Sequence, residues 1–174
     1  IGYLSTVGVY GDRGGAWVDE TTPCRPGQIR SQHRLVAEEA WRSLAERRNV
    51  PLAIFRLAGI YGPGRNALAN LAAGEARRIV KPGQVFKRIH VGDIATTVAA
   101  AIRHNARGIF NVADDEPAPP QDVVAFAAGL MGVAPPPEIP FAEAALSPMG
   151  RTFYAENKRV SNALMKERLL PQLA

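Results

Sequence analysis

Two neighbouring hydroxyl side chains, Ser5 and Thr6, end the apolar segment that opens the sequence. Residues 1–6 have the composition of a buried strand, and the glycines at 8 and 11 indicate a turn after it. Side chains at the carboxyl end of a parallel strand face the crevice where open α/β sheets bind ligands. We therefore predict that Ser5 or Thr6 meets a ligand. The alternative is that they are ordinary small polar residues before a turn.

A second group of chemically capable side chains falls on one predicted helix, residues 30–48. Arg30 and Arg34 are four residues apart, so they share one helix face, and His33 lies on its flank. Arginine can donate to ligand hydroxyls or anions, whereas histidine has an intrinsic pKa suited to proton transfer. A surface histidine is the alternative for His33. The three histidines of the sequence lack ligand spacing, and we expect no metal site.

The elements that position these residues follow from hydrophobic spacing. A strand at 1–6, a long loop at 11–29, an amphipathic helix at 30–48 and a strand at 52–57 form a βαβ pattern. Such a unit has parallel strands joined by a right-handed crossover. The sequence therefore predicts an α/β fold with a partial Rossmann-like, doubly wound parallel sheet and a small carboxyl-terminal substrate lobe.

The rest of the chain continues the alternation of helices and strands. Glycine, proline and apolar spacing mark five further segments. They are an Ala-rich helix at 66–78, a short strand at 86–90, a helix that ends near His104, a strand at 108–112, and a helix from Pro119-Pro120 to Met131 that stops at Gly132. The tail from Asn157 is also predicted to be helical.

Composition places the chain among globular proteins. It has 174 residues, 47% hydrophobic and 21% charged, and no apolar run near the ~20 residues that span a bilayer. We expect a cytoplasmic protein without a membrane segment. Cys24 is the only cysteine, which excludes an internal disulfide. The net charge of +5 comes from scattered Lys and Arg, so we expect a solvated surface or an anionic small ligand, and no nucleic acid.

The opening segment and five later motifs share their order and spacing with one protein family. They are Ser5-Thr6-Val7-Gly8-Val9-Tyr10-Gly11, Asp19-Glu20 with Pro23, Arg34-Leu35-Val36-Ala37-Glu38, Phe55-Arg56-Leu57-Ala58-Gly59-Ile60-Tyr61-Gly62-Pro63-Gly64, Arg88-Ile89-His90-Val91-Gly92-Asp93, and Phe110-Asn111-Val112. The chain resembles the NAD-dependent epimerase/dehydratase family of extended short-chain dehydrogenases/reductases. It is most similar to the atypical, YeeZ-like members.

The resemblance implies a catalytic role for Thr6, with Ser5 beside it, in bonding a substrate carbonyl. The family's proton-transfer pair is Tyr-x-x-x-Lys, and counting back from Glu38 places Arg30 and Arg34 at those two positions. A guanidinium cannot exchange a proton usefully near neutral pH, so Arg30 cannot replace the tyrosine. Arg34 can still donate to the hydroxyls of the nicotinamide ribose.

The same resemblance implies the remaining contacts of a dinucleotide and a small-molecule substrate. Ala58, Gly59 and Ile60 correspond to the turn beside the nicotinamide, where an asparagine of the family is replaced by Gly59. Arg88 is a candidate contact for substrate phosphates. Tyr10 lies near the strand ends and is a candidate substrate contact, although family analogy favours packing.

The family's glycine-rich pyrophosphate turn does not occur in the sequence. We expect residues 1–174 to be the carboxyl-terminal half of a longer protein that binds NAD or NADP. On this view, residues 1–64 end the Rossmann domain and 65–174 are mainly the substrate lobe, with 86–112 returning to the sheet. The resemblance also implies a homodimer through helix 30–48.

Two functions remain open from the sequence. One is an NAD(P)-dependent oxidoreductase or epimerase that acts on a small carbonyl or sugar-derived substrate by hydride transfer, with water or His33 handling the proton. The other is a non-catalytic NAD(P)-binding regulatory protein, or an inactive fragment. The arginines at 30 and 34 favour the second, and the retained Thr6 favours the first.

Overall fold

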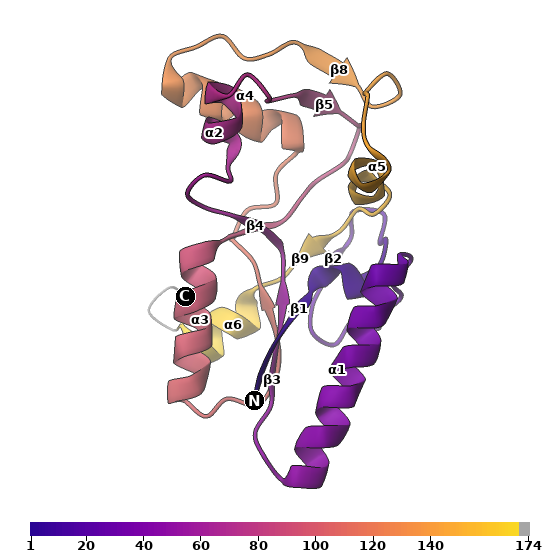
Figure 1. Ribbon diagram of the computed structural model, residues 1–174, viewed down its shortest axis with the longest axis vertical. Coiled ribbons are helices and arrows are strands. Elements are labelled where there is room, and N and C mark those ends of the chain that lie inside the picture. Colours follow the sequence, from indigo (N-terminus) through magenta and orange to yellow (C-terminus); the bar gives the residue numbers. More distant parts are fainter. Residues whose placement is uncertain (171–174) are drawn as a thin grey trace.

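A three-stranded parallel sheet forms the centre of the molecule's lower half (Figure 1). The computed structural model describes residues 1–170. The strand order is β1-β3-β7, with bounds Gly2–Thr6, Ala53–Leu57 and Gly108–Val112. Thr6 is level with Leu57, and Leu57 with Val112, so the three strands end together. The predicted α/β class with parallel strands is confirmed.

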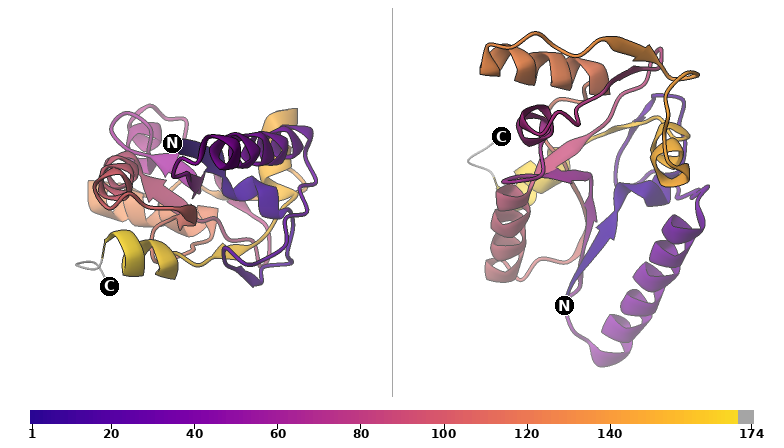
Figure 2. Two further views of the ribbon diagram at one scale, coloured as in Figure 1. Left: turned by 90° about the horizontal axis from the view of Figure 1, so that it is seen from below. Right: turned by 45° about the horizontal axis from the view of Figure 1, so that its top comes forward.

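Helices cover both faces of this sheet (Figure 2). The long helix α1, Ile29–Arg48, packs along β1, with Tyr3 and Trp41 ring centroids 6.1 Å apart. On the opposite face lie α3, Val91–Arg103, and α6, Ala163–Leu169. Phe55 and Phe110 stack in the core between sheet and helices, with centroids 6.2 Å apart. Successive side chains of β3 point to opposite faces of the sheet, so this strand contributes to a buried layer on each face.

Three two-stranded parallel ribbons extend the fold beyond the main sheet. They are β2 (Trp17–Val18) with β9 (Arg159–Val160), β4 (Gly59–Tyr61) with β6 (Arg88–His90), and β5 (Arg78–Val80) with β8 (Glu138–Pro140). The upper half also contains α2 (Ala67–Ala72), α4 (Pro120–Met131) and α5 (Pro148–Tyr154), and a 3-10 turn η1 (Val7–Tyr10) follows β1.

Most predicted elements are confirmed within two residues, and two were predicted too long. The helix expected at 66–78 ends at Ala72, and Gly74 then adopts a left-handed φ of +70° that a helix cannot continue through. The helical tail expected from Asn157 begins only at Ala163, because residues 159–160 pair with β2. Residues 171–174 of that tail lie outside the described residues.

Gly11 fixes the turn that leads the chain away from the sheet. Its φ is +71°, and a Cβ at this position would lie 1.9 Å from the carbonyl oxygen of Arg25. The Arg25 N–H donates in turn to the carbonyl of Val9 at 3.0 Å. The loop therefore folds back tightly onto η1, and only glycine fits there. Within residues 1–170, no helix is long and apolar enough to cross a membrane.

Candidate functional site

A cleft of about 860 Å3 opens at the carboxyl end of the sheet. The ends of β1 and β3, the strand β4, the first turns of α1 and parts of segments 85–88 and 146–160 line it. The cleft therefore combines residues from the two ends of the chain. A second hollow, of about 570 Å3, lies near the amino ends of β3 and β7 and contains none of the predicted site residues.

The cleft brings together seven of the nine predicted site residues. They are Thr6, Arg30, Arg34, Ala58, Gly59, Ile60 and Arg88. Ser5 and Tyr10 do not line it, and both are buried. The strand-end positions thus converge as the topology requires.

Thr6 sits at the point where β1 turns into η1. Its Oγ1 accepts a hydrogen bond from the N–H of Gly8 at 3.1 Å, which caps the turn. A threonine hydroxyl can accept and donate at once, so its own proton is free for a ligand oxygen in the cleft. This local cap fixes the rotamer of the candidate hydroxyl.

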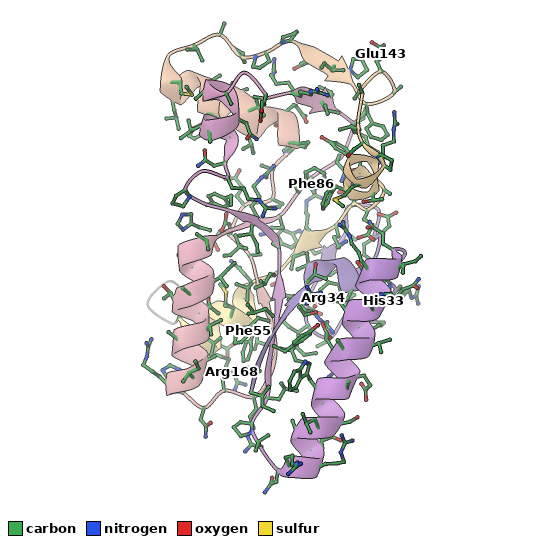
Figure 3. The ribbon with its side chains drawn as sticks, viewed as in Figure 1. His33, Arg34, Phe55, Phe86, Glu143 and Arg168 are labelled. Atoms are coloured by element: carbon green, nitrogen blue, oxygen red, sulfur yellow. The ribbon has the colours of Figure 1, made fainter. Side chains whose placement is uncertain are left out.

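Arg30 and Arg34 reach different places from the same helix face. The Arg30 guanidinium lies 4.8 Å from the ring centroid of Phe153, whereas Arg34 Nη1 donates to Tyr3 Oη at 3.2 Å and to the carbonyl of Leu4 at 3.1 Å. Figure 3 shows Arg34 on the sheet side of α1 and His33 beside it. His33 is exposed and does not line the cleft.

Gly59 lies at one wall of the cleft, where β4 pairs closely with β6. Its N–H donates to the carbonyl of Lys87 at 3.1 Å, and an added Cβ would lie only 3.2 Å from that oxygen. The close approach of β6 thus favours glycine at this position, and Gly59 is itself exposed in the cleft lining. Ala58 and Ile60 flank the glycine and complete this wall of the cleft.

Arg88 places a poorly compensated cation in the cleft. Its Nη1 donates to the carbonyl oxygens of Phe86 and Ala118 at 3.2 and 3.4 Å. Burial lowers the pKa of Arg88, and the negative charge of Asp114 opposes this only in part. An anionic ligand group would therefore be favoured beside it.

Ser5 and Tyr10 belong to a buried polar network instead. Ser5 Oγ donates to Glu38 Oε1 at 2.6 Å, and Tyr10 Oη donates to Asn111 Oδ1 at 2.7 Å. The guanidinium of Arg56 connects the two, because it pairs with Glu38 and lies 4.8 Å from the Tyr10 ring centroid. Burial opposes the charge on Arg56, but the Glu38 carboxylate and Tyr10 together outweigh it and raise the pKa of Arg56.

Three charged residues of the cleft were not predicted from the sequence. Lys87 Nζ donates to the carbonyls of Asp114 and Asp115 at 2.6 and 2.9 Å, and burial lowers its pKa. Lys158 pairs with Glu156 at 2.7 Å. No local motif marks Glu156 or Lys158, since the β2–β9 pairing brings them to the cleft from far along the chain. Within residues 1–170 no cluster of possible metal ligands occurs.

Comparison with known proteins identifies the family of this chain. The family model described as NAD dependent epimerase/dehydratase family matches residues 1–113. The chain belongs to this family. A functionally unknown conserved protein from Silicibacter pomeroyi is 56% identical, with a TM-score of 0.90 over 97% of this chain and 59% of that one. A search of curated proteins gave no match.

More distant solved structures share the fold. The dTDP-glucose 4,6-dehydratase from Streptomyces venezuelae, solved with NAD, is 14% identical with a TM-score of 0.76, over 97% of this chain and 53% of that one. The UDP-glucuronic acid 4-epimerase from Bacillus cereus, also solved with NAD, is 16% identical with a TM-score of 0.75, over 97% and 54%. The present chain spans little more than half the length of these relatives.

Proposed function

We propose that the chain forms the nicotinamide and substrate end of an NAD(P)-dependent oxidoreductase or epimerase that transfers hydride to or from a small carbonyl or sugar-derived substrate. One observation supports this most directly. A single cleft is lined by a capped hydroxyl at Thr6, an exposed glycine at Gly59 and guanidinium groups at 34 and 88. Hydroxyl, flat wall and cations are what a carbonyl, a nicotinamide and an anionic substrate group require.

Each cleft residue has a distinct role in this proposal. Bound NAD(P) would supply the hydride chemistry. Thr6 would donate to the substrate oxygen, the peptide of Gly59 would face the nicotinamide, and Arg34 would donate to ribose hydroxyls. Arg88 would hold a phosphate or carboxylate of the substrate. The exposed glycine at 59, which has no side chain, and the guanidinium donors of Arg34 fit a dinucleotide of this kind.

A second candidate function is non-catalytic NAD(P) binding, in a regulatory protein or an inactive fragment. The Arg30 guanidinium favours it, since this group stacks on Phe153 and cannot shuttle a proton. Such a protein would bind the dinucleotide without turning over a substrate.

The full-length protein distinguishes the two functions. NAD binding followed by a substrate-dependent change in nicotinamide absorbance supports the oxidoreductase, whereas binding without any change supports the regulatory protein. Thr6→Val should then lower kcat about 100-fold, and the loop variant Thr22→Val, outside the cleft, should not. The double change Arg30→Tyr with Arg34→Lys tests the scaffold, because increased turnover at unchanged NAD affinity indicates a catalytic design.

We further propose that residues 1–64 complete a Rossmann domain and that residues 65–174 mainly bind the substrate. The protein would be cytoplasmic, and two copies would dimerise through helix 30–48. Ile29 and Val36 support the dimer, since these apolar side chains on α1 are 70% and 69% exposed. Val36→Glu should convert a dimer to a monomer by light scattering. An unchanged mass would refute this interface.

A further inference from the structure

A second hydroxyl, that of Ser31, borders the same part of the cleft as Thr6. Ser31 belongs to the first turn of α1, and both residues line the cleft. A Cβ added to Gly8 would lie 2.7 Å from Ser31 Oγ and 3.4 Å from Thr6 Oγ1. The packing of η1 against α1 brings these side chains together. The two hydroxyl oxygens therefore flank one small space over Gly8.

The Ser31 hydroxyl differs from that of Ser5, the other buried serine within residues 1–170. Ser31 is 4% exposed and Ser5 is 5% exposed. Ser5 Oγ donates to Glu38 Oε1 at 2.6 Å. Within residues 1–170, the Ser31 N–H donates to the carbonyl of Gln28 at 2.9 Å, but the Ser31 hydroxyl has no partner. A buried hydroxyl without a partner is costly, so a ligand oxygen in the cleft would be favoured beside it.

The charges around these two hydroxyls favour a negative oxygen. Thr6 Oγ1 already accepts from the N–H of Gly8, so its own proton is available. Within residues 1–170, the one carboxylate that lines the cleft is Glu156, and it is paired with Lys158 at 2.7 Å. Converging hydroxyl donors in a cationic cleft suit a carbonyl oxygen, which becomes negative as hydride adds to its carbon. The guanidinium groups that line this cleft are those of Arg30, Arg34, Arg65 and Arg88.

We propose that Ser31 and Thr6 together bind the reacting oxygen of the substrate, and that a side chain at Gly8 would displace the Ser31 hydroxyl. The proposal rests on the proposed hydride-transfer function. In the reduction direction, hydride brings an electron pair to the carbonyl carbon, the carbon–oxygen π bond breaks, and its electron pair stays on the oxygen. The two hydroxyls donate to that oxygen, which then takes a proton from water and leaves hydroxide. Oxidation reverses each step.

The first test measures stability and needs neither cofactor nor turnover. Ser31→Ala removes a hydroxyl without a partner, so the urea midpoint of the full-length protein should stay unchanged or rise. Ser5→Ala is the matched control. It removes a buried hydroxyl that donates to Glu38, and it should lower the midpoint. A midpoint that falls as far in Ser31→Ala as in Ser5→Ala assigns a structural role to Ser31 and overturns the proposal.

The second test measures the binding of oxamate to the full-length protein saturated with NADH, by calorimetry. Oxamate carries a carboxylate and an amide carbonyl that hydride does not reduce. Ser31→Ala should weaken its binding about fivefold, because one hydrogen bond is lost. Gly8→Ala should weaken it as much, and Ser43→Ala, on the same helix but outside the cleft, should not. Unchanged binding in Ser31→Ala, or no binding by the parent, overturns the proposal.

Reduction of pyruvate, the reducible counterpart of oxamate, tests the underlying function separately. The full-length protein should oxidise NADH with pyruvate. Ser31→Ala should lower kcat about 100-fold, and Ser43→Ala should match the parent. Parent-level kcat in Ser31→Ala overturns the role of its hydroxyl. Oxamate binding that depends on Ser31, without any oxidation of NADH, would instead refute hydride transfer to such a carbonyl and support the two-hydroxyl site.

Discussion

The guanidinium of Arg56 donates to both carboxylate oxygens of Glu38, at 3.1 and 2.7 Å, and both side chains are almost fully buried. This bidentate pair joins α1 to the centre of the sheet. It therefore fixes the helix that carries Arg30 and Arg34 at the cleft.

Glu38→Gln should destabilise the fold by about 3–5 kcal/mol, because the change leaves the buried charge of Arg56 without its partner. Chemical denaturation of the chain measures the free energy of unfolding. The neighbouring Glu39 is 72% exposed, so Glu39→Gln should change stability by less than about 0.5 kcal/mol. Equal losses in the two variants would contradict the role assigned to the buried pair.

Glu20→Gln should make stability less sensitive to pH in the mildly acidic range. Burial raises the pKa of Glu20 above its ordinary value of 4.5, although its Oε1 accepts from the N–H of Asn111 at 2.7 Å. The protonated form therefore favours the fold, and this contribution is present below pH 4.5 and lost as pH rises through the raised pKa. Between pH 4.5 and neutral pH, the free energy of unfolding should therefore decrease more in the parent protein than in Glu20→Gln. Parallel pH profiles would rule out this linkage.

Arg34→Met should weaken NAD binding by the full-length protein about tenfold, which corresponds to about 1.4 kcal/mol. The variant removes guanidinium donors that line the cleft and keeps most of the apolar stem. Calorimetry measures the affinity, and Arg47→Met at the exposed far end of α1 is the control. Unchanged affinity in Arg34→Met would exclude a ribose contact.

Residues 1–174 on their own should not bind NAD measurably. The sequence contains no glycine-rich turn leading into a helix N-terminus, the arrangement that binds a pyrophosphate in this class of fold. The nicotinamide wall and Arg34 offer few contacts without it. Calorimetric titration of the isolated chain tests this expectation, and a micromolar dissociation constant would disprove it.

Local signals were sufficient for most of the fold. Helix α4 begins at Pro120 and stops at Gly132 as predicted, since proline suits a first helical turn and Gly132 adopts a left-handed φ of +67°. Helix 30–48 and the strand at 52–57 were also found from spacing alone. The two-residue strands β2 and β9 were missed, because each forms only through a partner remote in sequence. Strand β4 was missed for the same reason.

The candidate site was predictable only where it lies at strand ends. Thr6 and Gly59 could be placed there because a βαβ unit brings consecutive strand ends to one edge. Glu156 and Lys158 could not, since their position depends on how the last third of the chain returns to the cleft. Ser5 differs from Thr6 because successive residues of a strand face opposite sides, and Ser5 turns toward Glu38.

The contact between Arg34 and the carbonyl of Leu4 has a consequence for the colloidal behaviour of residues 1–174 on their own. Within residues 1–170, β1 pairs with β3 alone, and the carbonyl of Ile1 bonds toward β3, so that of Leu4 faces the open side. The arginine therefore occupies an acceptor that a strand from another molecule would need. Arg34→Met should scatter more light on storage than Arg47→Met, and equal scattering would show that the guanidinium does not protect this edge.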